Sequence, residues 1–201
     1  MRKLIVFATV LLLYIYPDVV CAQSAGIVKY KLLIEDGAGD NDLYNRYSAE
    51  ANKGAEKLSF TLEFNKEAAQ FFLDENIQNK DRDARIAIAW IEYDNTIFFD
   101  AASREVLYNN KADRFIRKEE LLIKEKAFSS WKLINEKKDI QGFTCYKAIG
   151  KKVYTQGDKT VSKDLTAWYC PELSLPYGPK GYGGLPGLIL ELNIGDALFG
   201  A

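Results

Sequence analysis

The sequence predicts an α+β protein built mainly from an antiparallel β-sheet, a curved sheet or half-barrel, with one or two short helices. Short segments of alternating apolar and polar residues recur about every 8–12 residues, as is typical of strands joined by turns. Only one or two segments show the spacing typical of helices. Together these features predict a mainly antiparallel sheet, and the sequence contains no internal repeat and no low-complexity linker.

The first 22 residues have the three parts of a cleavable secretory signal. Arg2 and Lys3 give a positive start, and residues 4–16 form an uncharged apolar run of 13 residues. Pro17 follows this run, and a cut after Ala22 fits the short side chains there. A transmembrane helix needs about 20 apolar residues, so a cleaved signal is predicted instead of a membrane anchor.

Cys21 raises lipid attachment as an alternative to simple cleavage. Bacterial lipoproteins usually carry leucine three positions before the modified cysteine and a small residue directly before it. Here those positions hold Asp18 and Val20, so the match fails and lipid attachment is the weaker alternative. The prediction is an exported protein that works in the periplasm, at the outer envelope or outside the cell.

Residues 23–201 are expected to form a single β-rich domain, which is long enough to bury a core. The whole chain has a formal charge of −1 at pH 7. This near-neutral charge argues against nucleic acid or an anionic membrane as the main partner. No apolar run of spanning length follows the signal, so no transmembrane helix is expected after signal cleavage.

The alternating pattern locates the expected strands. Each is a short run rich in aliphatic or aromatic residues and bounded by turn residues. The expected strands are residues 28–34, 58–64, 71–73, 96–99, 106–108, 131–135, 143–153, 166–169 and 188–192, with a short strand at 197–199.

Two segments are candidates for helices. Apolar residues recur every four positions from Leu43 to Ala55, with Asp42 as a candidate N-cap. Gly54 weakens this prediction because glycine disfavours helices. Residues 86–93 fit a strand or a helix equally well. Two charged segments, 76–85 and 117–127, are expected to be solvated loops, and residues 171–186 a loop rich in proline and glycine.

Cys145 and Cys170 lie on consecutive expected strands. If the chain turns at Gly157 and Asp158, these two cysteines face each other across a hairpin, within the Cα separation that a disulfide accepts. The same register places Lys147 opposite Trp168 and Lys151 opposite Asp164. A disulfide in an oxidising compartment is the preferred interpretation and would stabilise the fold by about 3–4 kcal/mol. Two buried free thiols are the alternative.

The complete absence of histidine limits the available chemistry. It excludes Ser-His-Asp and Cys-His catalysis, histidine general bases and zinc sites of the HExxH type. The remaining catalytic routes use carboxylate pairs, lysine, tyrosine or a metal ion bound by carboxylates. No catalytic constellation can be recognised in the sequence, and no cofactor is expected.

Three acidic or glycine-rich motifs resemble ligand sites only superficially. Asp81 and Asp83 form a DxD pattern within a charged stretch, where a solvated loop is the simpler interpretation. The acidic residues of 36–42 lack the glycine and glutamate that an EF-hand calcium loop needs. Residues 181–186 end in proline where a GxGxxG phosphate loop has its last glycine. No metal or phosphate site is therefore predicted.

The segment from Ala167 to Glu191 resembles the GLPGLI family, also called the Porph_ging family, which comprises exported bacterial proteins of unknown function. Residues 131–148 also fit the family's pattern, whereas residues 26–130 fit it only in the order of strands. The resemblance implies export but no activity, and it supplies no catalytic residue. Family members usually continue with further strand, so this chain is expected to end early, soon after a turn at residues 195–196. The motif residues are Trp168, Gly178, Pro179, Gly184, Leu185, Pro186, Gly187, Leu188 and Ile189.

The motif itself has two interpretations. In the first it is structural: Leu188 and Leu190 lie in a buried strand and Gly187 has a positive φ. In the second it forms the lip of a ligand site or a docking surface. If the chain ends early, the strand could also be an exposed, aggregation-prone edge.

Three functions remain open at this point. Non-catalytic binding of an apolar small molecule or an envelope protein is preferred because tyrosine and phenylalanine are abundant, with 12 and 11 residues. The alternatives are an enzyme that uses carboxylates on envelope or extracellular glycans and a structural or assembly component of the outer envelope.

Overall fold

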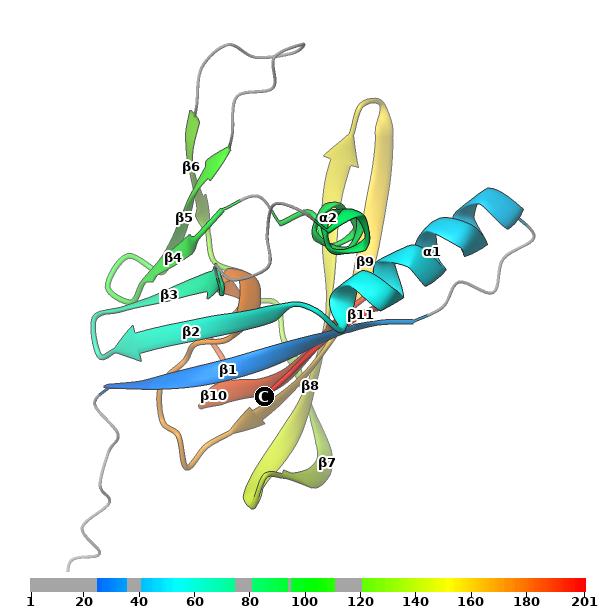
Figure 1. Ribbon diagram of the computed structural model, residues 1–201. Helices are drawn as coiled ribbons and strands as arrows, with labels where there is room; N and C mark the ends of the chain where they lie inside the picture. The colour runs from blue at the N-terminus through cyan, green and yellow to red at the C-terminus, as the bar shows by residue number, and fades with distance from the viewer. Residues whose placement is uncertain (1–24, 36–40, 75–80, 94, 111–120) are drawn as a thin grey trace, which may run out of the picture.

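The computed structural model describes residues 25–35, 41–74, 81–93, 95–110 and 121–201. The predicted signal at residues 1–22 lies outside the described residues, as do Asp36 and Asp40 of the acidic segment considered for calcium. Within the described part, the fold class predicted from the sequence is confirmed: the protein consists mostly of antiparallel sheet with two helices (Figure 1).

The described strands form one sheet of eleven strands in the order β6-β5-β4-β3-β2-β1-β11-β10-β9-β8-β7. Each neighbouring pair is antiparallel. The strands are β1 (Ala25–Ile34), β2 (Ser59–Asn65), β3 (Ala68–Leu73), β4 (Ile97–Asp100), β5 (Glu105–Asn110), β6 (Leu121–Lys126), β7 (Lys132–Ile140), β8 (Phe143–Gln156), β9 (Lys159–Cys170), β10 (Leu188–Ile194) and β11 (Ala197–Gly200).

The outermost strands of the sheet, β6 and β7, follow each other directly in the sequence. Only residues 127–131 connect them, so the sheet bends strongly to bring its two ends within reach of that short linker. Figure 1 shows the arm of β4, β5 and β6 on one side and the long β8–β9 hairpin on the other. The sheet stays open, and its concave side faces the space between these two arms.

The two helices pack against each other through a glycine. Helix α1 (Asp42–Ala55) begins after Asn41, whose side chain accepts hydrogen bonds from two backbone amides, so Asn41 is the N-cap and not Asp42. A Cβ atom on Gly54 would lie 2.0 Å from the backbone oxygen of Asp83 at the start of helix α2 (Arg82–Trp90). The glycine that weakened the helix prediction is therefore required for the close approach of the helices.

Two segments expected to be loops belong to secondary structure. Residues 121–126 form strand β6 instead of a charged loop, and residues 82–85 begin α2, which also resolves the ambiguous segment 86–93 as helix and then turn. Residues 121–126 are rich in charged side chains because β6 is an exposed edge strand, and this charge is what suggested a loop. Lys124 and Lys126 pair with Glu105 on β5 at 2.7 and 3.1 Å, so the charges support the strand pairing.

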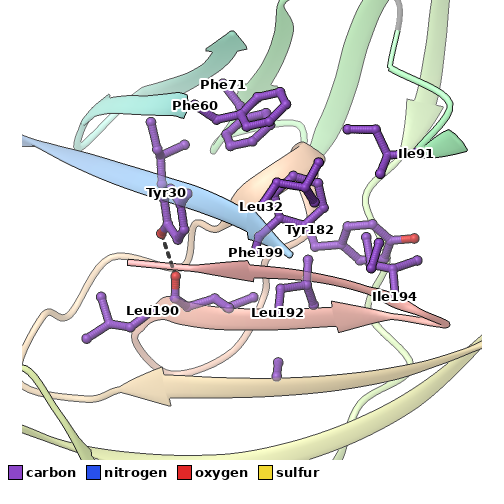
Figure 2. Packing of buried hydrophobic residues seen from close by; sticks show 14 of the residues in the cluster. Tyr30, Leu32, Phe60, Phe71, Ile91, Tyr182, Leu190, Leu192, Ile194 and Phe199 are labelled. Atoms are coloured by element: carbon purple, nitrogen blue, oxygen red, sulfur yellow. Dashed lines mark hydrogen bonds between the residues drawn. The ribbon is translucent and has the colours of Figure 1, made fainter. Parts of the chain in front are cut away.

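The core lies where β1, β2, β10 and β11 meet the aromatic residues of β3. Phe60, Phe71 and Phe199 pack with ring centroids 5.2–5.9 Å apart. Tyr30 is fully buried and donates a hydrogen bond of 2.5 Å to the backbone oxygen of Ile189 (Figure 2). The hydrogen bond fixes β1 to β10, the strand that contains the last residues of the family motif.

Strand β10 lies inside the sheet, between β9 and β11. Leu188 and Leu190 are 1% and 4% exposed, as the structural interpretation of the motif predicts. Because β11 pairs with both β10 and β1, β10 is not an edge, and the expectation of an exposed, aggregation-prone strand is wrong for this fold.

Candidate functional site

The loop rich in glycine and proline lies on the concave side of the sheet. Lys180 and Gly181 both have left-handed backbone conformations, with φ of 55° and 73°. A Cβ atom on Gly181 would lie 2.7 Å from Cγ1 of Val106 on β5, so only glycine lets the loop press against this arm. The Lys180 ammonium donates a hydrogen bond to the backbone oxygen of Ile91, at the C-terminal end of α2.

The opposite side of the loop contacts the linker between β6 and β7. Trp131 donates a hydrogen bond of 2.8 Å to the backbone oxygen of Gly183. Phe128 stacks edge-on against Trp131 and packs against Tyr182, with ring centroids 4.8 and 5.9 Å apart. A Cβ atom on Gly150 of β8 would lie 2.8 Å from the Phe128 ring. The loop is thus fixed against both arms of the sheet.

A cleft of about 320 Å³ remains between the two arms, above this loop. One wall comes from β4, β5 and β6, the other from β8 and β9, and residues after α2 close one end. Its volume lies at the lower end of the range for small-molecule sites, about 300–1,000 Å³. The lining residues are Glu92, Asn95, Ile97, Val106, Tyr108, Glu125, Lys152, Tyr154, Lys163, Lys180, Tyr182 and Ile194.

Two lysines stand directly opposite each other in the wall formed by β8 and β9. Lys152 pairs in register with Lys163, and both side chains line the cleft. Lys163 forms an ion pair of 3.0 Å with Glu92. Lys152 has no carboxylate within 4 Å among the residues that the structure describes, and its ammonium lies 5.7 Å from the centre of the Tyr182 ring. Like charges in direct register destabilise a sheet, so this lysine pair is unfavourable without a further anion.

Tyr182 presents a polar group to the cleft from a buried position. Its side chain is only 7% exposed, and its hydroxyl points away from Leu32 and Phe199, beside Ile194 (Figure 2). Within the described residues this hydroxyl has no hydrogen-bond partner. Burial raises the pKa of Tyr182 far above its ordinary value, and the nearby Glu125 and Glu92 raise it further. The hydroxyl therefore remains a proton donor at neutral pH.

Glu125 supplies an unpaired negative charge on the opposite wall. It lies opposite the buried Val106 in the β5–β6 register, and residues in direct register share a face of the sheet. No basic side chain lies within 4 Å of its carboxylate in the described part of the chain. Among the described residues, the cleft thus has an ammonium without an ion pair on one wall and a carboxylate without one on the other.

The family motif supports the cleft from below without lining it. Leu185, Leu188 and Ile189 are buried, and a Cβ atom on Gly178 would lie 2.7 Å from Ile189. Pro179 is buried next to Lys180, and Gly184 has a φ of 77°, whereas Pro186 is exposed.

Trp168 and Gly187 serve the fold elsewhere. The Lys138 ammonium lies 4.5 Å from the centre of the Trp168 ring and pairs with Glu191 at 2.6 Å. Gly187 has a φ of 150°, and a Cβ atom there would lie 2.1 Å from the backbone oxygen of Cys170. Positive φ at Gly187 is therefore confirmed.

The hairpin register predicted from the turn at Gly157 and Asp158 is confirmed. Lys147 pairs with Trp168 and Lys151 with Asp164, whose side chains form an ion pair of 3.2 Å. Cys145 and Cys170 continue this register at its end, where both are fully buried and both are free thiols. Burial raises the pKa of the Cys145 thiol to about 12. The disulfide is not formed in the structure and stays a prediction.

The acidic DxD motif has a structural role. The side chain of Asp81 caps α2 by accepting a hydrogen bond of 3.0 Å from the backbone amide of Ala84. Lys57 pairs with Asp81 and Asp83 at 2.7 and 3.4 Å. Within the described ranges, no group of three or more acidic or cysteine side chains is placed to hold a metal ion.

A second hollow lies between the two helices and is almost entirely apolar. Its walls are Leu43, Tyr44, Tyr47, Ile86 and Trp90. Trp90 and Tyr44 both donate hydrogen bonds to Asp196 in the β10–β11 turn, at 3.0 and 3.4 Å, which ties the helices to the sheet. In the part of the chain that the structure describes, no helix is long and apolar enough to cross a membrane.

The fold and the cleft together define an open, strongly curved antiparallel sheet protein with a cleft on its concave side. Residues 131–191 match the family described as "Protein of unknown function (Porph_ging)". The family resemblance predicted from the sequence is thereby confirmed for this segment, which runs from Trp131, through both strands of the long hairpin, to β10. No curated protein matches the chain.

Two solved structures of PNGF-II, in different space groups, have a similar fold. Their TM-scores are 0.50 and 0.51, each at 15% sequence identity, and the alignments cover 88% and 89% of this chain. This chain covers only 27% of each PNGF-II chain. At this identity the likeness concerns the fold alone.

None of the cleft residues was predicted as a site from the sequence. The signal for one wall was nevertheless present, because the register that pairs Lys151 with Asp164 also pairs Lys152 with Lys163. On that basis the sequence could have shown that one face of the β8–β9 hairpin pairs opposite charges and that the other face pairs like charges. Glu125 could not have been recognised in this way, since its strand was interpreted as a loop.

Proposed function

We propose that this protein is an exported, non-catalytic binding protein whose concave cleft holds a small amphipathic ligand. The observation that carries the proposal is the Tyr182 hydroxyl, which lines the cleft and has no hydrogen-bond partner among the described residues, although the side chain is only 7% exposed. The hydroxyl reaches the open cleft and is not one of the fully buried polar atoms without a partner, so a ligand that enters the cleft can accept its hydrogen bond in place of water. Export is supported by the three-part N-terminal segment.

The lining of the cleft changes the expected ligand. An apolar ligand was expected from the abundance of aromatic residues, but three lysines and two glutamates share the cleft with Ile97, Val106 and Ile194. Isolated charges are unfavourable next to a purely apolar molecule because they would lose water without gaining a partner. A ligand with both polar and apolar parts fits this lining better.

Native mass spectrometry of protein purified without denaturant tests the binding proposal. We expect the wild-type protein to retain a small molecule that the Lys152→Trp variant loses, because tryptophan at this position fills the cleft. Lys151→Trp, on the outer face of the same strand, is the matched control and should retain it. No bound molecule in the wild-type protein, or equal retention by both variants, would count against the proposal.

N-terminal sequencing of the protein recovered from the exporting cell tests the location. A mature chain that begins at Gln23 is expected, because Ala22 ends the predicted signal. Retention of Met1, or a diacylated Cys21, would contradict this part of the proposal.

A second candidate function rests on Glu92 and Glu125, which line the same cleft. Two carboxylates in a cleft are the minimum for glycoside hydrolysis. Glu92, however, is already paired with Lys163, which favours binding over catalysis. Release of reducing sugar from envelope oligosaccharides by the wild-type protein, lost in Glu125→Gln, would establish the enzyme instead.

A further inference from the structure

Opposite walls of the cleft carry opposite charges that do not pair with each other. Lys152 lies on β8 and Glu125 on β6, and no ion pair joins them within 4 Å in the described part of the chain. Both side chains line the same hollow of about 320 Å³. A molecule in the cleft therefore meets a positive group on one side and a negative group on the other.

The two faces of the β8–β9 hairpin show that the charge at Lys152 is not a general property of the hairpin. On the outer face Lys151 stands opposite Asp164 and pairs with it at 3.2 Å. On the cleft face Lys152 stands opposite Lys163, and Glu92 neutralises only the second lysine. An anion beside Lys152 would relieve this unfavourable pairing.

The floor between the charged walls suits a ligand whose middle part is uncharged or aromatic and carries one hydrogen-bond acceptor. Tyr182 presents a hydroxyl there that has no partner among the described residues, and the ammonium of Lys152 lies 5.7 Å from the centre of its ring, so a neutral donor and a positive charge share this part of the cleft. Tyr108 and Tyr154 add aromatic surface, and Ile97 and Val106 are apolar. The third lysine of the described lining, Lys180, is not a free charge, because it donates to the backbone oxygen of Ile91.

We infer that the ligand of this cleft is a zwitterion, a short peptide with free ends, whose carboxylate contacts Lys152 and Tyr182 and whose ammonium contacts Glu125. The inference rests on the proposed function, since it names the ligand class of the same site. Ammonium and carboxylate at its two ends complement both walls at once. A simple fatty acid would leave Glu125 unpaired, and a cationic amine would leave Lys152 unpaired.

Calorimetric titration with the dipeptide leucyl-phenylalanine tests the inference. Its C-terminal amide, its N-acetyl form and the doubly blocked form serve as the comparison ligands, at low ionic strength and pH 7. Charge-assisted hydrogen bonds contribute more than neutral ones, so blocking either end is expected to weaken binding to the wild-type protein about tenfold or more.

Two variants test which end of the dipeptide contacts which wall of the cleft. Lys152→Met should abolish the preference for the free acid over the amide while keeping the preference for the free amine. Glu125→Gln should do the reverse. The matched controls, Lys151→Met and Asp164→Asn on the outer face, should keep both preferences, and thermal melts verify that every variant is folded.

Three results would overturn the inference. They are equal affinity for the free and doubly blocked dipeptide, unchanged preferences in Lys152→Met and Glu125→Gln, and no binding of any form. A cleft-bound molecule found by native mass spectrometry would still support the proposed function in each case. If that molecule is absent as well, the proposed function fails together with the inference.

Discussion

Lys152 and Lys163 stand directly opposite each other on β8 and β9, on the face of the hairpin that lines the cleft. Only Lys163 has a carboxylate partner in the described residues, Glu92 at 3.0 Å. Two lysines in direct register are unfavourable in a sheet, and here the pair lies where the curved sheet forms the cleft. Local departures of this kind are most often found at functional sites.

Replacing Lys152 by methionine should stabilise the protein in the absence of ligand. The change removes the repulsion with Lys163, and cross-strand charge pairs are worth about 0.2–1 kcal/mol. Thermal melts at low ionic strength measure the effect, with Lys151→Met as control. The control should lower the melting temperature slightly, because it breaks the exposed pair with Asp164. A lower melting temperature for Lys152→Met than for Lys151→Met would show that the lysine pair is not unfavourable.

Leu190→Ala should destabilise the fold by about 2–5 kcal/mol. Leu190 is 4% exposed on a strand that has neighbours on both sides, so truncation leaves a cavity. Urea unfolding followed by circular dichroism measures the change. Leu133→Ala on the outermost strand β7, where the side chain is 56% exposed, should change the free energy of unfolding by about 0.5 kcal/mol or less. Similar losses at both positions would argue against the assignment of β10 to the core.

Gly187→Val should be more damaging than Leu190→Ala. Position 187 has a φ of 150°, and the new Cβ atom would lie 2.1 Å from the backbone oxygen of Cys170. Backbone, unlike a flexible side chain, cannot move aside without shifting β9. Gly200→Val is the control, because a Cβ atom there meets nothing within 4 Å. Soluble yield and melting temperature should fall for Gly187→Val alone, and a near-normal melt for it would be incompatible with this geometry.

The oxidised, exported protein should contain no free thiol. Cys145 and Cys170 lie on the two strands of one hairpin, one position beyond the paired Tyr146 and Tyr169, and an oxidising compartment allows the two thiols to lose two electrons and two protons to a disulfide donor. Thiol titration of the unfolded, unreduced protein measures this directly, and reduction should lower the melting temperature. Two titratable thiols in that sample would establish the free-thiol alternative, which is the state in the structure.

The sequence predicted most strands because their side chains alternate between a buried and an exposed face. The turn at Gly157 and Asp158 also set the register of the β8–β9 hairpin. Strand β6 escaped prediction because it is an edge strand whose exposed side chains are largely charged. Gly54 misled the interpretation of α1, since its role lies in the contact with α2 and not within its own helix.

The cleft could not be predicted because it forms between segments that are distant in sequence. Glu92, Glu125 and Tyr182 meet only after the sheet has bent and the loop has packed inside it. Charge counting gave a balanced chain, and a balanced total does not show that Lys152 and Glu125 form no ion pair with any described residue. The motif residues attracted attention instead, because the features that fix a loop, glycine and proline, are visible in sequence.

Methyl NMR of the protein during titration with leucyl-phenylalanine tests the central claim most directly. Ile97, Val106 and Ile194 line the cleft, whereas Ile27 and Val153 are exposed on other surfaces, at 64% and 59%. Methyl signals of the first three residues should shift together and saturate, while those of Ile27 and Val153 stay in place. Saturable shifts at Ile86, in the hollow between the helices, with none at Ile97, Val106 and Ile194, would show that the ligand binds elsewhere.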